Sequence, residues 1–448
     1  MTLELLCKVV DNYGDIGFVY RLARALSETE AGLRLRLHVD DLQAFASLRP
    51  GLEPSAPVQE LLGWELVDWN IEVAELEKTC ARGAPPSLVI ECFACGRPPA
   101  LEELLFDPSR TDTRLIVNLE HLTAEAWADE LHRMPSATRS ALVKKVIFMP
   151  GFTPATGGLL IDGGFRAAAA RWKSPGSAPP SQPPVPKATG PVPSATNTVP
   201  QWTETPPPPP PPQSDGQSTR AALRRELALR AGIDLGPGDE ERPWVLVFSY
   251  ERDYRRIVAD LASWTPSKTM PSSALALVAA GRSAPAFFEA WRAEGETFPA
   301  LALPFLPQEI WDEFILAADL AIVRGEESLA RAALSGRPFL WHAYRQDNNH
   351  QLVKVRALLD RMRPAFADSP AAAGAFAAYE ALSLAFNERL ADGPEAGGDE
   401  DFLPVLEALP SLEAGFAAFA QGLFANGDLA ARLLAFIREM RYDTARFS

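Results

Sequence analysis

The chain has 448 residues, of which 47% are hydrophobic and 23% charged, a composition typical of a folded protein with two or three domains. Its 58 acidic residues outnumber its 43 basic residues, and the net charge of −15 argues against general nucleic-acid binding. The N-terminal segment has no signal-peptide pattern, and no uninterrupted apolar run reaches the ~18 residues of a membrane span. We therefore expect a cytoplasmic protein that needs no membrane.

Residues 1–172 alternate between short apolar runs and helical patterns. The apolar runs predict strands at residues 3–10, 35–40, 87–92, 114–122 and 145–152. Helical patterns lie between them, for example at residues 18–30 and 125–134. Nearly continuous apolar strands that alternate with helices are typical of a parallel sheet covered on both faces. The first domain is therefore predicted to be a doubly wound α/β domain.

The first predicted strand runs into the turn Asp11-Asn12-Tyr13-Gly14-Asp15, and a helix follows. Asp15 stands where a helix N-cap belongs, and Asp11 and Asn12 are ordinary turn residues. Two carboxylates on a turn between a buried strand and a helix are also a suitable catalytic pair. The spacing alone leaves both interpretations open.

Cys92 and Cys95 have the spacing of a redox or metal-binding motif. The remaining cysteines, Cys7 and Cys80, stand apart and supply no second ligand pair for zinc. Because Cys92 follows an apolar strand directly, we expect buried thiols and no metal site.

Residues 173–219 differ from the rest of the chain. The segment from 174 to 219 holds 16 prolines, with Ser, Thr and Gln and almost no aliphatic residues. Such a segment cannot bury a core and is predicted to be an extended or disordered linker. A ligand for a proline-binding domain is the alternative interpretation.

A second α/β alternation occupies residues 220–410. Its apolar runs predict strands at residues 243–251, 273–281, 299–307, 320–325 and 337–344. Helical patterns at residues 310–319 and 328–336 separate the later ones. Residues 411–448 have a helical pattern throughout and are predicted to form C-terminal helices.

Ligands of open α/β sheets bind beyond the carboxyl ends of the strands. At one such end Arg324 and Gly325 close a strand and Ser328 opens a helix, whose free amides and positive dipole suit a phosphate. Glu326 and Glu327 would repel a phosphate if they faced it, whereas turned aside they could accept hydrogen bonds from a ribose or simply stabilise the helix. The chain has no P-loop and no dinucleotide fingerprint, which disfavours a kinase or a dehydrogenase.

Five motifs in order resemble the EarP family of protein-arginine rhamnosyltransferases: DNYGDIG, GFTPATGGL, PFLPQ, RGEES and RPFLWHAYRQDNNHQLVK. The resemblance covers nearly the whole chain except the proline-rich tract and an acidic loop at residues 391–401. It implies the GT-B architecture of two Rossmann-like domains facing a cleft. It also implies transfer of rhamnose from dTDP-β-L-rhamnose to an arginine of translation elongation factor P, with inversion and without a metal or other cofactor.

The resemblance gives the opening carboxylates a role. A guanidinium stays protonated in proteins and its lone pairs are delocalised, so a single weak base does not make it a nucleophile. By resemblance, Asp15 is the proton acceptor and Asp11 orients the arginine. Asn12, Tyr13 and Gly14 would shape the acceptor pocket.

The resemblance also implies a donor site in the second domain. Its expected residues are Tyr250, Phe305, Gln308, Arg324, Gly325, Glu326 and Ser328. The rings and Gln308 would bind the thymine, with Phe248 and Trp311 adding to the apolar wall, and the remaining residues would hold ribose and pyrophosphate. Glu327 stands where an aspartate is expected in the family, and the proline-rich tract is an insertion in the family pattern.

Three other interpretations remain. Another GT-B transferase with a glycan acceptor would keep the site at Arg324 but need no paired carboxylates. A non-catalytic scaffold would present the run Pro206–Pro212 to a partner. A sugar-nucleotide epimerase is disfavoured, because no dinucleotide fingerprint or Tyr-x-x-x-Lys pair is present.

Overall fold

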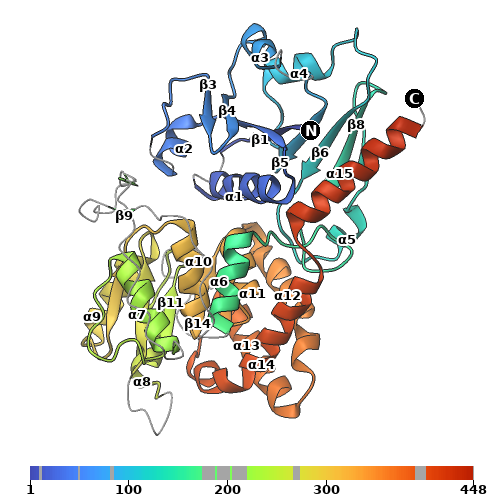
Figure 1. Cartoon of the computed structure of the whole chain (residues 1–448). Coiled ribbons are helices and arrows are strands. Elements are labelled where there is room, and N and C mark those ends of the chain that lie inside the picture. The colour runs from blue at the N-terminus through green and yellow to red at the C-terminus, as the bar shows by residue number, and fades with distance from the viewer. Residues whose placement is uncertain are drawn as a thin grey trace. The chain divides into compact units, whose positions relative to one another are not determined.

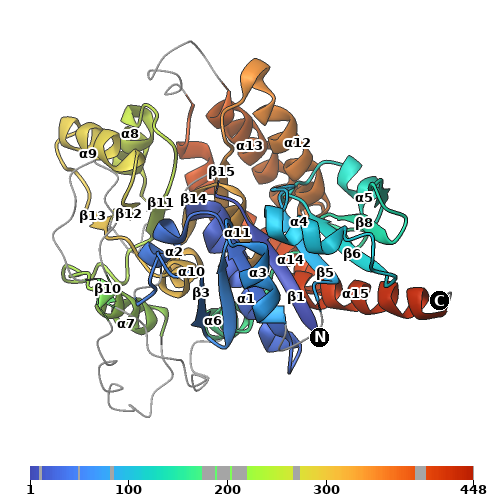
Figure 2. The same ribbon diagram turned by 90° about the horizontal axis from the view of Figure 1, so that it is seen from above.

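The computed structural model of the chain describes residues 1–9, 13–48, 51–80, 85–173, 187–188, 202–203, 219–265, 273–388 and 400–446. The chain forms two compact units (Figures 1 and 2). One consists of Met1–Gly163 together with Asn426–Ser448, and the other of Gly164–Ala425.

The first unit is built on a sheet in the order β3-β4-β2-β1-β5-β6-β8-β7. Its strands are β1 (Thr2–Cys7), β2 (Arg34–Val39), β3 (Val58–Leu61), β4 (Trp64–Asp68), β5 (Leu88–Cys92), β6 (Arg114–Leu119), β7 (Pro135–Ser136) and β8 (Val143–Phe148). The strands from β4 to β8 in this order are parallel, while β3 and β7 pair antiparallel at the two edges.

Helices cover both faces of this sheet, as the nearly continuous apolar strands predict. They are α1 (Tyr13–Thr29), α2 (Leu42–Leu48), α3 (Val73–Cys80), α4 (Pro99–Leu105), α5 (Trp127–Leu131) and α15 (Leu429–Arg446). Successive residues of β1 point to opposite faces: Leu5 joins the core under α1 and α15, and Leu6 joins the core under α3 and α4 (Figure 1).

The second unit contains a parallel sheet in the order β13-β12-β11-β14-β15. Its strands are β11 (Trp244–Val247), β12 (Leu275–Ala279), β13 (Ala300–Leu303), β14 (Leu320–Arg324) and β15 (Phe339–His342). Its α-helices are α6 (Gly163–Lys173), α7 (Arg220–Ala231), α8 (Arg255–Ser263), α9 (Ser283–Ala293), α10 (Gln308–Ala317), α11 (Glu326–Ser335), α12 (Gln351–Met362), α13 (Pro370–Asn387) and α14 (Leu403–Ala425). Two short 3₁₀ turns, Asp347–Asn349 and Arg363–Phe366, flank α12.

All ten strands predicted from apolar runs are confirmed as β1, β2, β5, β6, β8 and β11 to β15. The hairpin of β3 and β4 was not predicted. Its turn residues Leu62 and Gly63 both have positive φ, of 53° and 82°, as a two-residue hairpin turn of the primed type requires. A leucine at the first of these positions is an unusual turn residue, so the sequence carries only a weak signal there.

Residues 411–446 are almost entirely helical, as predicted, but their two helices, α14 and α15, belong to different units. The chain breaks at Gly427, whose φ is +90°, and α15 then joins the first unit. The backbone N–H of Leu429 donates to the carbonyl of Leu159 at 2.9 Å, and the N–H of Ile161 donates to the Asp428 carboxylate at 2.7 Å. These bonds connect the start of α15 to a segment more than 260 residues earlier, a connection that local pattern does not reveal.

The boundary predicted at residue 172 also differs, because α6 belongs to the second unit. The Arg331 guanidinium lies 4.6 Å from the centre of the Phe165 ring, and the Trp172 indole donates to Glu313 at 3.4 Å. Within the predicted linker, the structure describes one antiparallel pair, β9 (Lys187–Ala188) with β10 (Trp202–Thr203). Lys173 ends α6 and Thr219 is the N-cap of α7, and the rest of the predicted linker lies outside the described residues.

Within the described residues, α14 is long and apolar enough to cross a membrane. Two glutamates interrupt this helix, so it contains no uninterrupted apolar run of the length of a membrane span. It packs against α11 and α13, and its Leu406, Leu412 and Phe416 are each at most 1% exposed. In this structure α14 is a core helix of the second unit.

The packing of α14 predicts which glycine substitutions in this helix lower the stability of the protein. A Cβ atom at Gly415 would overlap the ring of Phe366, which is itself buried. We expect Gly415→Ala to lower the free energy of unfolding by about 1–3 kcal/mol through overpacking. Gly422→Ala in the same helix is the control, because a Cβ there meets no atom within 4 Å, and the better helix propensity of Ala favours folding by up to about 1 kcal/mol. Equal shifts of the thermal unfolding midpoint in the two variants would contradict this packing.

Candidate active site

In the first unit the strand order reverses at β1. The chain proceeds from β1 to β2 and β4 on one side, and then to β5, β6 and β8 on the other. Loops on either side of such a point lead away from each other, which leaves a crevice at the carboxyl ends of the two strands. In the sequence, the predicted turn from Asp11 to Asp15 separates β1 from α1, so Gly14 and Asp15, at the start of α1, lie at this edge of the sheet.

The structure describes only part of that turn. Asp11 and Asn12, predicted for the acceptor site, lie outside the described residues, as does the side chain of Tyr13. The helix α1 begins at Tyr13, so Asp15 occupies the third helical position and not the predicted N-cap. A carboxylate in the first turn still interacts favourably with the positive end of the helix. Gly14 is exposed and Asp15 is partly exposed, so both are within reach of a ligand.

The thiols around Asp15 show which strands it lies near. Burial raises the pKa of Cys7 and of Cys92, and the negative charge of Asp15 raises the pKa of both further. Burial likewise raises the pKa of Cys95 to about 12. Asp15 is therefore close to the ends of both β1 and β5, and the cysteines are neutral thiols at neutral pH. Among the described residues, no group of three or more His, Cys, Asp and Glu side chains could hold a metal ion.

An aromatic wall that was not predicted lies beside this carboxylate. Phe18, one turn after Asp15 in α1, has its ring 5.2 Å from that of Phe93, which directly follows β5. Phe93 has a φ of +59°, uncommon for a bulky residue, and its ring stacks on His121 at 4.2 Å. No periodic pattern marks these residues as a group, because Phe18 lies in α1, Phe93 follows β5 and His121 lies in the loop after β6.

The second unit has the same topological feature. The strand β11 lies between β12 and β14, so the order reverses between β11 and β14. Tyr250 comes three residues after β11, and Arg324 is the last residue of β14. Two of the predicted donor residues are thus neighbours at the expected edge of the sheet.

Arg324 is positioned by two aromatic rings. Its guanidinium carbon lies 4.8 Å from the ring centres of both Phe248 and Tyr250. Its Nε atom is buried without a hydrogen-bond partner, and no carboxylate of the described residues forms an ion pair with this side chain. Because a guanidinium binds phosphate oxygens through parallel N–H donors, this unpaired cation suits a phosphate.

The helix that follows Arg324 presents its N-terminus at the same place. Gly325 precedes α11 with a φ of +71° and a ψ of 168°, a conformation essentially restricted to glycine. The hydroxyl oxygen of Ser328 accepts a hydrogen bond from the Trp311 indole at 3.4 Å, which leaves its proton to donate. Trp311 in turn packs its ring 5.0 Å from that of Phe248.

The two glutamates of this turn differ in their surroundings. Glu327 accepts a hydrogen bond at 3.0 Å from Arg331, which is 1% exposed. Asp312 lies 3.9 Å from the same guanidinium. Glu327 is therefore held by the second turn of its own helix, whereas Glu326 remains partly exposed in the first turn.

Phe305 and Gln308 lie on the neighbouring segment between β13 and α10. Phe305 is 42% exposed, and Gln308 begins α10 one turn before Trp311. Neither forms a hydrogen bond or ring contact with Tyr250, Arg324 or Ser328 among the described residues. The structure thus brings together Tyr250, Arg324 and Ser328 with Gly325 and Glu326. Gln308 lies one turn of α10 from Trp311, and no contact among the described residues adds Phe305 to this group.

Sequence reasoning predicted the strand next to Arg324 but assigned no site residue to it. In the parallel pairing of β14 with β15, Arg324 is opposite His342. The ring of His342 lies 5.2 Å from that of Tyr250, and the exposed ring of Tyr344 lies 5.7 Å from it. The predicted strand at residues 337–344 was the available signal, because parallel strands end at a common edge.

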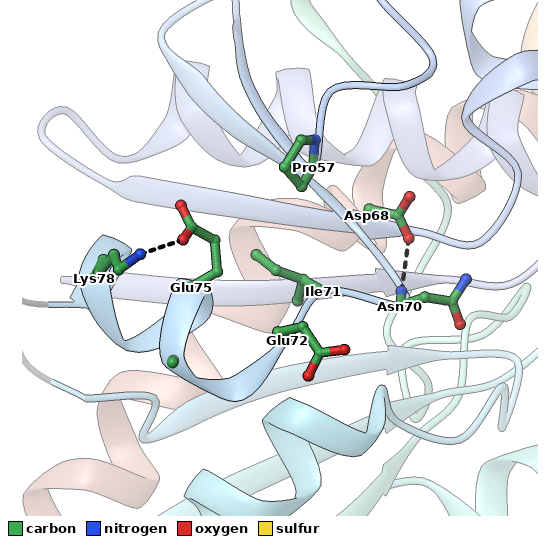
Figure 3. Close-up of a pocket in the computed structure, with 8 residues that line it drawn as sticks. Pro57, Asp68, Asn70, Ile71, Glu72, Glu75 and Lys78 are labelled. Carbon is green, nitrogen blue, oxygen red and sulfur yellow. Dashed lines mark hydrogen bonds and ion pairs between the residues drawn. The ribbon is translucent and has the colours of Figure 1, made fainter.

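A surface hollow elsewhere in the first unit contains none of these residues. It lies between the end of β4 and α3 and is lined by Pro57, Asp68, Asn70, Ile71, Glu72, Ala74, Glu75 and Lys78 (Figure 3). Its polar side chains are engaged locally: Lys78 pairs with Glu75, and Asp68 accepts from the backbone of Asn70 (Figure 3).

Comparison with known proteins assigns the chain to a family. Residues 3–187 and 214–438 match the family described as elongation factor P (EF-P) rhamnosyltransferase EarP. This chain belongs to the EarP family. The matched segments leave out residues 188–213, which lie inside the proline-rich tract, so that part of the tract is outside the shared EarP pattern.

Two EarP relatives cover most of the chain. A Pseudomonas putida protein named protein-arginine rhamnosyltransferase is 33% identical over 383 residues, 83% of this chain and 84% of its own length. A Pseudomonas aeruginosa protein of the same name is 32% identical over 357 residues, 80% of each chain.

A solved structure described as "Structural basis for EarP-mediated arginine glycosylation of translation elongation factor EF-P" has a TM-score of 0.54 to this chain. It is 22% identical, and the match covers 98% of this chain and 99% of the other. This likeness confirms the predicted fold class, GT-B with Rossmann-like units.

The geometry at Arg324 makes a binding prediction. We expect Arg324→Lys to weaken binding of dTDP about tenfold, because lysine lacks the planar fork and stacks poorly between two rings. Titration calorimetry measures the dissociation constant. Arg363→Lys, which changes an exposed ion pair with Glu380 in the same unit, is the matched control. Unchanged dTDP affinity in Arg324→Lys would show that this cation does not hold the phosphates.

Proposed function

We propose that this chain transfers L-rhamnose from dTDP-β-L-rhamnose to an arginine side chain of translation elongation factor P, with inversion at the sugar's anomeric carbon. The observation that carries the proposal is the Arg324 guanidinium, which lies just before α11 and pairs with no carboxylate of the described residues, in a chain of the EarP family. The names of the two Pseudomonas relatives support it. A translation factor as acceptor also places the activity in the cytoplasm.

The donor is an anion and needs cationic and amide partners. In the proposal, Arg324 and the first amides of α11 hold the pyrophosphate, and Ser328 donates its hydroxyl to it. Glu326 accepts hydrogen bonds from the ribose, and Gly325 lets the backbone approach closely. Tyr250 and Phe305 pack on the thymine, while Gln308 binds its polar edge.

The acceptor is a cation and needs carboxylates. Asp11 and Asp15 hold the guanidinium between them, and Asn12, Tyr13 and Gly14 line its pocket. A guanidinium nitrogen attacks the anomeric carbon, the bond from this carbon to the dTDP oxygen breaks, and dTDP leaves on the opposite side with the bonding electrons. Asp15 takes the nitrogen's proton as the new bond forms, because only then does the nitrogen become acidic enough for a carboxylate.

The leaving dTDP gains negative charge in this step. Arg324, Ser328 and the α11 N-terminus lie at the proposed pyrophosphate position, where they would stabilise that charge without a metal ion. The proposal therefore includes no cofactor besides the donor substrate, and no nucleic acid or membrane partner. A glycan acceptor is the alternative that would leave this half of the site unchanged.

Intact mass of elongation factor P from the same source tests the proposal. Incubated with this protein and dTDP-β-L-rhamnose, the factor should gain the mass of one deoxyhexosyl unit. Asp15→Asn should slow this gain by about a hundredfold or more, the usual effect of losing a general base. Asp41→Asn is the matched control, because Asp41 is an exposed carboxylate that accepts from the backbone at the start of α2.

No mass gain with the unaltered protein, under conditions in which it binds dTDP, would overturn elongation factor P as the acceptor. A gain that is equal in the unaltered protein and in Asp15→Asn would overturn the role of the opening turn. Removal of residues 174–219 should leave the gain unchanged, and a gain that is lost on this removal but kept in Asp15→Asn would show that the proline-rich tract is needed and the opening turn is not.

A further inference from the structure

His342 is a buried titratable side chain that the proposed chemistry does not use. It is the last residue of β15 and is 8% exposed. Its Nδ1 atom lies 2.6 Å from the Oγ atom of Ser249 and 3.3 Å from the backbone nitrogen of Tyr250. Because a backbone N–H can only donate, Nδ1 must carry the lone pair, and the ring proton is therefore on Nε2. The Ser249 hydroxyl then also donates to Nδ1.

The surroundings of the ring keep it in this neutral form. Burial lowers the pKa of His342 well below its usual range, and the positive charges of Arg252, Arg345 and Arg324 lower it further. A protonated ring would have to donate from Nδ1, where two donors already point. The histidine is thus an acceptor of fixed tautomer, in contrast to an exposed imidazole that titrates near neutral pH.

The backbone on both sides of His342 is held by one side chain. The Oδ1 atom of Asn387, at the end of α13, accepts from the N–H of Ala343 at 2.8 Å. Its Nδ2 atom donates to the carbonyl of Trp341, also at 2.8 Å. Parallel pairing places His342 opposite Arg324. The imidazole therefore has a fixed position relative to the strand that carries the phosphate-binding arginine.

Tyr250 depends on this imidazole because its own strand has ended. The last ladder bond after β11 runs from the N–H of Phe248 to the carbonyl of Ile322 at 2.8 Å. Two residues later, the N–H of Tyr250 finds its acceptor in His342. Its ring lies edge-on to the imidazole and face-on to the Arg324 guanidinium. The imidazole thus supports both the backbone and the ring of Tyr250.

We propose that His342 is a positioning residue for the nucleotide-sugar donor. By accepting hydrogen bonds from Ser249 and Tyr250, it fixes the peptide that holds the Tyr250 ring against Arg324. The inference rests on the proposed function, since it is a claim about the donor half of that site. Loss of the acceptor leaves a buried N–H unpaired, and the Tyr250 segment shifts to satisfy it. Donor binding weakens as a result, while the acceptor protein binds as before.

Two amide variants distinguish the role of Nδ1 from that of Nε2. The side-chain oxygen of asparagine reaches the position of Nδ1, whereas that of glutamine reaches the position of Nε2. We expect His342→Asn to bind dTDP within about threefold of the unaltered protein, and His342→Gln and His342→Leu to bind it about tenfold more weakly. Calorimetry measures the dissociation constant for dTDP. Initial rates should show the same change in the KM for dTDP-β-L-rhamnose, with the KM for elongation factor P unchanged.

His132→Asn is the matched control. The Nδ1 atom of His132 accepts from the backbone N–H of Met149 at 3.1 Å, so it has the same kind of bond in the other unit. Its replacement should leave the affinity for dTDP unchanged. Ser249→Ala keeps the imidazole and removes one donor, and we expect about threefold weaker dTDP binding from this smaller change. If a histidine variant fails to fold, as judged by thermal unfolding, Ser249→Ala still tests the positioning role of His342.

Equal dTDP affinity in His342→Leu and the unaltered protein would overturn the positioning role. Equal weakening in His342→Asn and His342→Gln would also overturn it, because the position of the acceptor would then not matter. Failure of the unaltered protein to bind either dTDP or dTDP-β-L-rhamnose would instead overturn the proposed function itself, and this inference with it.

Discussion

Reversal of strand order in a parallel sheet is the constraint on which both candidate sites depend. At β1 in the first unit and at β11 in the second, the chain changes the direction in which it adds strands. Only there do neighbouring loops separate and leave strand ends open to a ligand. The buried strands hold these two edges in place, because their apolar side chains fill the cores on both faces of the sheets.

The two edges differ in charge, and the difference matches the two reactants. Asp15 stands at the first edge, and Arg324 and the positive end of α11 at the second. An arginine acceptor is a cation, and a nucleoside diphosphate is an anion. In the proposed reaction each reactant would therefore meet an edge of opposite charge, with the ring of Phe93 at the first edge and that of Tyr250 at the second as flat apolar surfaces.

Local pattern predicted the strands and the residues that follow one another closely in sequence. Arg324, Gly325 and Ser328 could be grouped because they lie within one strand-to-helix turn. His342 could not be, because its proximity to Tyr250 depends on which strands are neighbours and in what register. The same limit explains α15, whose return to the first unit depends on Leu159 and Ile161, and the β3–β4 hairpin, whose turn begins with an atypical leucine. The family motifs supplied what periodicity could not, namely the sugar and the acceptor.

We propose a division of labour between the two edges: the opening turn binds the arginine, and the Arg324 turn binds dTDP. Calorimetric titration of Asp15→Asn with dTDP tests it most directly, since it asks whether the base contributes to donor binding at all. We expect a dissociation constant within about twofold of that of the unaltered protein, because the change removes a charge from the acceptor side alone. A loss of tenfold or more, in a variant that melts like the unaltered protein, would contradict the division and require Asp15 to be part of the donor site.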